Sequence, residues 1–113
     1  MSSPTAAQLA MCQRYQASIV PVEAHSIVGI ALRTLRMLPL NGLRHSPSGD
    51  TSGWFIWGGE LSVDPGFFAP LHVEHLVEEA PTLMPYLAMG PGWRVLLAPD
   101  HQDVWYDEKL LGV

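Results

Sequence analysis

The chain has 113 residues, 48% of them hydrophobic and 15% charged, and its formal net charge is −5 at pH 7. This length allows one domain with a substantial core and excludes two independent domains. Cys12 is the single cysteine, which excludes an internal disulfide, a Cys-x-x-Cys redox pair and a cysteine-rich zinc site. We therefore expect a protein of a reducing compartment.

The sequence lacks the segments that direct a protein to a membrane. No apolar run approaches the roughly 20 residues that span a bilayer. Residues 1–4 show neither the basic nor the apolar region of a signal peptide. We expect a soluble cytoplasmic protein without a membrane partner.

The charges are distributed unevenly along the chain. Up to His45, four arginines stand against Glu23, whereas the remainder carries ten acidic residues against Arg94 and Lys109. Because binding of phosphates needs a basic groove, this distribution argues against a nucleic-acid partner. A basic partner matches it better, and the alternative is that the acidic residues only keep the surface soluble.

Two helices are predicted in the N-terminal part. Ser3 followed by Pro4 is typical of a helix start, and this helix should continue to about Ala17. Apolar residues at helical spacing predict a second helix over residues 23–38, which Pro39 ends.

The middle of the chain alternates loops with one strand. Residues 41–53 contain Asn-Gly, Ser-Pro and Ser-Gly steps, which predict a loop with a short extended piece at 43–45. Residues 54–57 read Trp-Phe-Ile-Trp between glycines, so they predict a strand covered on both faces, with two largely structural tryptophans. Residues 61–70 should form a turn-rich connection whose two phenylalanines contact the core.

The C-terminal part is predicted to contain short helices and a hairpin. Residues 73–80 have one apolar face and predict a short helix, and a second helical turn should lie between Pro81 and Gly90. The apolar strand 93–98, a connector and the returning strand 103–107 predict a β-hairpin. Together the elements predict one α+β domain with a small, mostly antiparallel sheet and helices packed on it.

A metal site is not indicated by the spacing of the histidines. Residues 72–75 read His-Val-Glu-His, which is not the His-Glu-x-x-His pattern of zinc enzymes. A third ligand would have to come from His45, His101 or a distant acidic residue. We therefore expect no bound metal, and we expect His75 to pair with Glu79 one helical turn later.

Motifs of catalysis and of cofactor binding are also lacking. Ser52 lies in Gly-Asp-Thr-Ser-Gly, which is not the Gly-x-Ser-x-Gly pattern of a nucleophile. The glycines at 58–59 and 90–92 are too sparse for a phosphate-binding loop. The sequence predicts no catalytic residue and no cofactor.

Acidic and aromatic residues are interleaved in the C-terminal two-thirds of the chain, which holds all four tryptophans. Tryptophan and tyrosine rimmed by carboxylates are typical of protein-binding hot spots, because the rings supply contact area and the acids steer a basic partner. The candidate partner-binding residues are Asp100, Asp103, Trp105, Tyr106, Asp107, Glu60, Asp64, Glu74 and Glu78. Reversing the charges of Asp103 and Asp107 is expected to slow association without unfolding the domain.

Three short motifs carry a family resemblance. They are Ser-Gly-Trp-Phe-Ile-Trp-Gly-Gly-Glu at 52–60, Asp-Pro and Phe-Phe at 64–68, and Pro-Thr-Leu-Met-Pro-Tyr-Leu at 81–87. Over residues 52–92 the chain resembles the immunity-protein-33-like domains of bacterial polymorphic toxin systems. Those domains have a Ser-Gly-Trp strand, an Asp-Pro loop and a proline-punctuated short helix.

The resemblance changes towards the two ends of the chain. Residues 91–94 and 103–108 look like a distinct branch of that group, found in uncharacterised bacterial proteins. Residues 1–40, predicted to be helical, do not match the leading strand that is usual in the family. The resemblance implies one such domain over residues 1–113, with the matched region and the hairpin at 52–113.

The resemblance implies a non-enzymatic protein that binds and neutralises a cognate protein toxin. Nuclease toxins often carry basic clefts, which an acidic surface would cover. One alternative is a small-molecule-binding or enzymatic domain whose pocket is lined by Trp54, Trp57, Trp93 and His72. Another is a homo-oligomer with its aromatic residues at the subunit contact.

Overall fold

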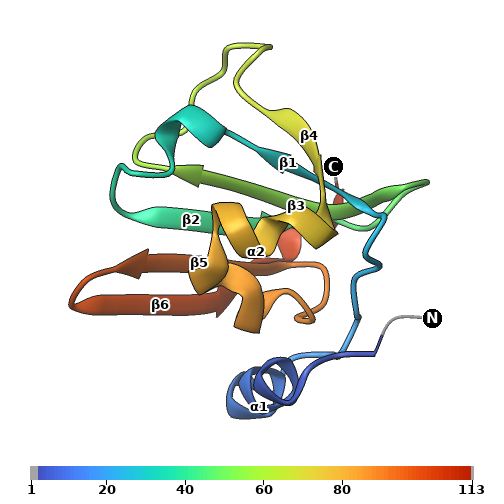
Figure 1. Ribbon diagram of the computed structural model, residues 1–113. Helices are drawn as coiled ribbons and strands as arrows, with labels where there is room; N and C mark the ends of the chain where they lie inside the picture. The colour runs from blue at the N-terminus through green and yellow to red at the C-terminus, as the bar shows by residue number, and fades with distance from the viewer. Residues whose placement is uncertain (1–2, 113) are drawn as a thin grey trace.

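Six strands form one mixed sheet in the computed structural model, which describes residues 3–112 (Figure 1). The strands are β1 (Ile27–Ile30), β2 (Leu40–Arg44), β3 (Thr51–Gly58), β4 (Ala69–His72), β5 (Trp93–Ala98) and β6 (His101–Tyr106). Their order in the sheet is β4-β1-β3-β2-β5-β6. β1 runs parallel to β3, and the other four pairings are antiparallel.

The helices are short. They are the α-helices α1 (Ala6–Tyr15) and α2 (Leu76–Glu79), and the 3-10 helices η1 (Leu32–Thr34), η2 (Val73–His75), η3 (Pro81–Tyr86) and η4 (Glu108–Gly112). The predicted α+β class, with a small and mostly antiparallel sheet under helices, is confirmed. Between residues 3 and 112 no helix has the length and the apolar character needed to cross a bilayer.

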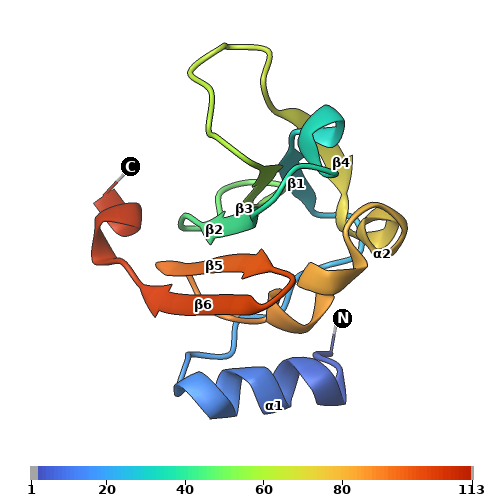
Figure 2. The ribbon, with the colours of Figure 1, turned by 90° about the vertical axis from the view of Figure 1, so that its left-hand side faces the viewer.

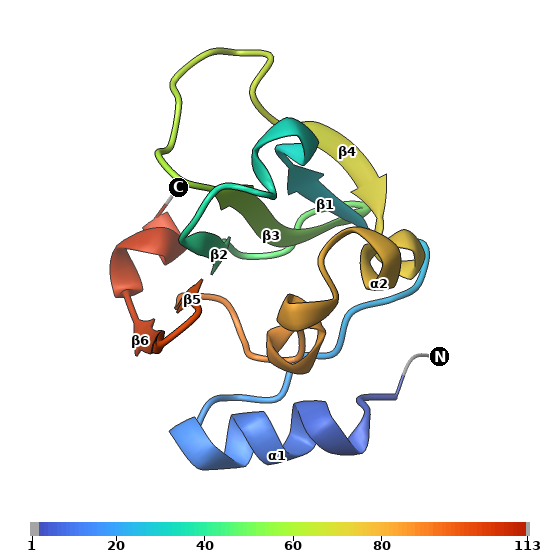
Figure 3. The same ribbon diagram turned by 60° about the vertical axis from the view of Figure 1, so that its left-hand side comes forward.

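Both faces of the sheet are covered, as predicted from the large side chains on both sides of the strand at residues 54–57. The helical face carries Trp54 and Ile56 and is covered by α1, α2 and η3 (Figure 3). The loop face carries Phe55 and Trp57 and is covered by the 59–68 loop and by η4, which lie on the other side of the sheet from α2 (Figure 2). Trp54 and Trp57 are 1% and 4% exposed, so both are structural residues.

The predicted helix over 23–38 is wrong, because β1 and η1 occupy this stretch. β1 reads Ile-Val-Gly-Ile, and β-branched side chains fit a pleated sheet better than a helix. β1 also gains hydrogen bonds from strands on both sides, which a local apolar pattern does not reveal. A Cβ at Gly29 would lie 2.7 Å from the Phe55 ring, so the close approach of β1 to β3 requires this glycine.

Two further boundaries differ from the sequence prediction. The N-cap of α1 is Thr5 and not Ser3, because the Thr5 hydroxyl accepts from the Gln8 amide while the Gln8 side chain accepts from the Thr5 amide. This capping box satisfies two backbone donors at once. The predicted loop over 41–53 contains most of β2, and the extended piece expected at 43–45 is the end of that strand.

The other predicted elements are present, although α1 ends at Tyr15 and not at about Ala17, β3 begins within the predicted 41–53 loop, and β6 begins at His101 and not at residue 103. β3 includes residues 54–57, η2 and α2 fill 73–79, η3 lies between Pro81 and Gly90, and β5 and β6 form the hairpin. The two phenylalanines at 67–68 pack against the loop-face core. Residues 69–70, expected in the preceding connection, already belong to β4.

Arg44 is a buried cation that connects three segments of the helical face. Its Nε donates to the Ser52 carbonyl at 2.9 Å, and its Nη1 donates to the carbonyls of Val20 at 2.6 Å and Met89 at 2.9 Å. Burial lowers the pKa of Arg44 to about 10, so its guanidinium remains charged at neutral pH. The nearby Cys12 is fully buried, and burial raises the pKa of its thiol. A buried thiol in apolar surroundings is unreactive, so Cys12 has a structural role.

Candidate functional site

The β5–β6 hairpin presents a strand at the edge of the sheet. Ala98 pairs with His101, so the turn consists of two residues, Pro99 and Asp100. Because side chains alternate along a strand, His101, Asp103 and Trp105 share one face of β6. The register places this face on the loop side, since Trp105 pairs with Arg94, Arg94 with Leu43, and Leu43 with the loop-face residue Phe55.

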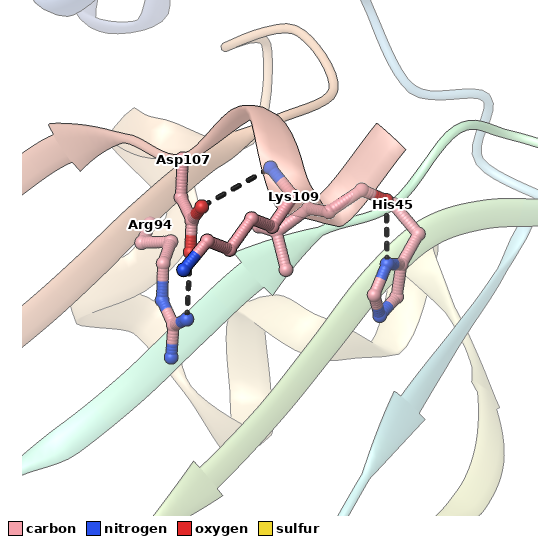
Figure 4. A network of polar contacts seen from close by, with 5 residues as sticks. His45, Arg94, Asp107 and Lys109 are labelled. Atoms are coloured by element: carbon pink, nitrogen blue, oxygen red, sulfur yellow. Dashed lines mark hydrogen bonds and ion pairs between the residues drawn. The ribbon is translucent and has the colours of Figure 1, made fainter. Parts of the chain in front are cut away.

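Trp105 is an exposed ring held in place by a charged neighbour. The Arg94 guanidinium lies 5.5 Å from the centroid of the Trp105 ring. The same guanidinium donates to Asp107 Oδ2 at 3.2 Å, and Asp107 Oδ1 accepts from the Lys109 amide at 3.1 Å (Figure 4). Trp105 is 37% exposed, so the hairpin offers an oriented aromatic side chain to solvent.

η4 is fastened to the loop face at two points. The first is the Asp107 carboxylate, which accepts from Arg94 of β5 and from the Lys109 amide, and the second is the His45 ring, whose Nδ1 donates to the Leu110 carbonyl at 2.9 Å (Figure 4). Leu110 is buried in the loop-face core. These contacts fix the backbone that follows β6 and hold the end of the hairpin still.

Two carboxylates of the hairpin face solvent. The Asp103 side chain is 61% exposed, and its Oδ2 lies 3.6 Å from His101 Nε2. Asp100 is exposed in the turn. We name Asp100, His101, Asp103 and Trp105 the β6 surface.

Two of the predicted hairpin residues do not belong to this surface. Tyr106 points to the helical face, where its ring packs against Trp93 with 5.7 Å between the centroids. Asp107 is partly buried and already engaged by Arg94 and by the Lys109 amide. The expected charge reversal at Asp107 would therefore disturb the fold, and only Asp103 of that pair suits such a test.

The other predicted acids lie elsewhere. Glu60 and Asp64 are exposed in the 59–68 loop, where Asp64 Oδ1 accepts from the Gly66 amide. Glu74 and Glu78 lie in η2 and α2, which follow β4 at the opposite edge of the sheet from β6. The structure thus places Asp103 and Trp105 on one face of β6 and Asp100 in the adjoining turn, and it places Glu74 and Glu78 at the opposite edge of the sheet.

Arg94 and His101 are site residues that the sequence pattern did not predict. Residues 99–102 were expected to form a connector, whereas the observed turn has two residues. A two-residue turn sets the cross-strand pair of Arg94 and Trp105 directly. The Pro-Asp step between two apolar strands was the available signal for this register.

The four residues of the alternative pocket do not converge. Trp54 and Trp57 lie on opposite faces of β3, Trp93 packs against Tyr15 on β5's helical side, and His72 is exposed at the end of β4. An open depression of about 520 Å³ lies beside η1 and contains none of these four residues.

Ser52 does not have the surroundings of a nucleophile. It is 3% exposed. Its hydroxyl donates to the Ile27 carbonyl at 2.9 Å and accepts from the Trp54 amide at 3.2 Å. This serine links two strands.

Comparison with known proteins identifies the family. A family model described as the Imm33-like domain matches residues 7–107, from the first turn of α1 to the end of the hairpin. This range extends the resemblance of residues 52–92 over the N-terminal part as well. No curated protein and no solved structure matches the chain. The chain belongs to the Imm33-like domain family.

Proposed function

We propose that this protein is a non-enzymatic immunity protein that binds and neutralises a cognate protein toxin. The observation that carries the proposal is the match of the Imm33-like domain over residues 7–107, which includes the whole sheet and all of α1 except its first residue. A protein that acts by binding needs a stable surface and no reacting groups. The engaged hydroxyl of Ser52 agrees with this.

The β6 surface is our candidate for the toxin contact. Trp105 is a large, oriented ring of the kind that supplies binding energy at hot spots. Asp103 on the same face of β6 and Asp100 in the adjoining turn add negative charge to this edge, so they would steer a basic toxin during encounter. Because β6 is an edge strand, its outer side is also the place where a partner can approach the backbone.

The exposure of Trp105 could also be explained by a homo-oligomer that forms through the β6 edge. It predicts that the purified chain alone is a dimer, whereas the immunity proposal needs no self-association. Light scattering coupled to size exclusion separates the two before any partner is added.

The proposal predicts a charge-dependent association rate. Replacing Asp100 and Asp103 together by Lys should lower the association rate with the toxin by about tenfold at low salt, because opposite charges accelerate encounter. The dissociation rate should change less. Stopped-flow or surface-based kinetics with the product of the neighbouring toxin gene measures both rates.

A matched control is available on the other edge of the sheet. Replacing Glu23 and Glu79 by Lys makes the same change in net charge at two exposed positions, one before β1 and one in α2. This variant should associate at nearly the parent rate. Equal slowing of both double variants would show that net charge, and not the β6 surface, governs association.

A further inference from the structure

Three of the chain's five histidines gather around one glutamate at the β1–β4 edge of the sheet. His72 ends β4, Glu74 and His75 belong to η2, and His25 lies in the segment before β1. Residues 72–75 are neighbours in sequence, whereas His25 lies 47 residues before His72. The fold therefore supplies the third histidine that the spacing of the motif lacks.

Backbone pairing holds His25 at this place. β1 and β4 pair with Ile27 opposite His72. Beyond that pair, the Val73 amide donates to the Ser26 carbonyl at 2.9 Å and the Glu74 amide donates to the Ala24 carbonyl at 3.0 Å. His25 thus lies between two backbone residues that are fastened to η2.

The side-chain distances are close to those of a metal site. One ligand atom each from His72, Glu74 and His75 lies within 4.8 Å of the others. Glu74 Oε1 is 3.7 Å from His75 Nε2, and Glu74 Oε2 is 3.9 Å from His25 Nδ1. Donor atoms around a tetrahedral zinc ion are about 3.3 Å apart, because each zinc–nitrogen bond is about 2.0 Å long. His25 joins this group through Glu74, with 6.4 Å between the ring centroids of His25 and His72, so binding of one ion requires the exposed side chains to rotate towards one another.

We propose that His25, His72, Glu74 and His75 bind one zinc ion. Three imidazole nitrogens and one carboxylate oxygen form a donor set that suits zinc and not magnesium or calcium, which prefer oxygen alone. This departs from the expectation of no metal, and the reason is the position of His25. The ion would clamp the segment before β1 to η2.

The site is separate from the proposed toxin contact. It lies beyond β4, whereas the β6 surface lies at the opposite edge of the sheet. Zinc would therefore stabilise the fold and would not compete with a partner at β6. Failure of the zinc site would leave the proposed function untouched.

Zinc titration of the tag-free, chelator-stripped full chain tests the proposal by calorimetry. We expect one zinc ion per chain, and at least about tenfold weaker binding in His25→Gln, His72→Gln and His75→Gln, since even the loss of an outer-shell partner weakens zinc sites about tenfold or more. Zinc should also raise the thermal midpoint of the parent, because it binds the folded chain, and this rise should be lost in His72→Gln.

The matched control is His101→Gln. His101 is an exposed histidine that also lies close to a carboxylate, at 3.6 Å from Asp103, yet it stands outside the cluster. This variant should bind zinc like the parent. The proposal is overturned if zinc does not saturate at one ion per chain, if any of the three cluster variants binds as tightly as the parent, or if His101→Gln weakens binding.

Discussion

Replacing Arg44 by Met should lower the free energy of unfolding by about 4 kcal/mol, because several buried carbonyls would lose their donor at a cost of about 1–3 kcal/mol each. The carbonyls concerned belong to Val20, Ser52 and Met89, on three segments that the guanidinium holds together. Methionine fills a similar volume and donates no hydrogen bond. The decrease in the free energy of unfolding therefore reports the contribution of the hydrogen bonds of Arg44. Urea unfolding followed by tryptophan fluorescence reports the change.

Arg36→Met is the matched control for this prediction. Arg36 is exposed, and exposed substitutions change stability by within about 0.5 kcal/mol. Arg44→Lys should fall in between, because one ammonium cannot reach all of the carbonyls. If Arg44→Met unfolds within about 1 kcal/mol of the parent, Arg44 does not hold the helical face together.

Trp54→Ala should cost about 4–5 kcal/mol, at the upper end of the range for large core residues. Trp54 is 1% exposed, and its Nε1 donates to the Leu87 carbonyl at 3.0 Å. Alanine would leave a cavity under the helical layer and would remove the nearer of two donors to the Leu87 carbonyl, the other being Arg44 Nη1 at 3.4 Å. Trp54→Phe should recover most of the loss, because it restores volume without the hydrogen bond.

Trp57→Ala should cost less, about 3 kcal/mol. Trp57 packs edge to face against Phe68 of the 59–68 segment, with 6.0 Å between the ring centroids. A covering loop can settle into a cavity more readily than packed helices can. Chemical denaturation of the two alanine variants side by side gives the comparison, and an equal or larger loss for Trp57→Ala would contradict this view of the loop face.

Local patterns predicted the elements whose own residues specify their type. The Trp-Phe-Ile-Trp strand, the helices around residues 73–86 and the hairpin each follow from spacing and turn residues within their own segment. β1 could not be found in this way, because its partners β3 and β4 lie about 25 to 45 residues later in the chain. The apolar spacing over 23–38 is compatible with a helix, but long-range pairing with β3 and β4 makes residues 27–30 a strand.

The same limitation applies to the two candidate sites. Asp103 and Trp105 were identified from composition and alternation, but Arg94 was missed because the hairpin turn was taken to be two residues too long. His25 was missed because a helix assigned to 23–38 gave no reason to bring residues 24–26 beside η2. His75 was expected to pair with Glu79, whereas its carboxylate neighbour is Glu74 at 3.7 Å.

The most direct test of the proposed function is the growth of bacteria that express the toxin encoded directly before this chain's gene. Co-expression of the parent chain should restore growth, and the Glu23→Lys/Glu79→Lys variant should restore it equally. The Asp100→Lys/Asp103→Lys variant should protect poorly, although its exposed positions leave the fold intact. If the parent chain gives no protection and does not bind that toxin, the proposed function is contradicted.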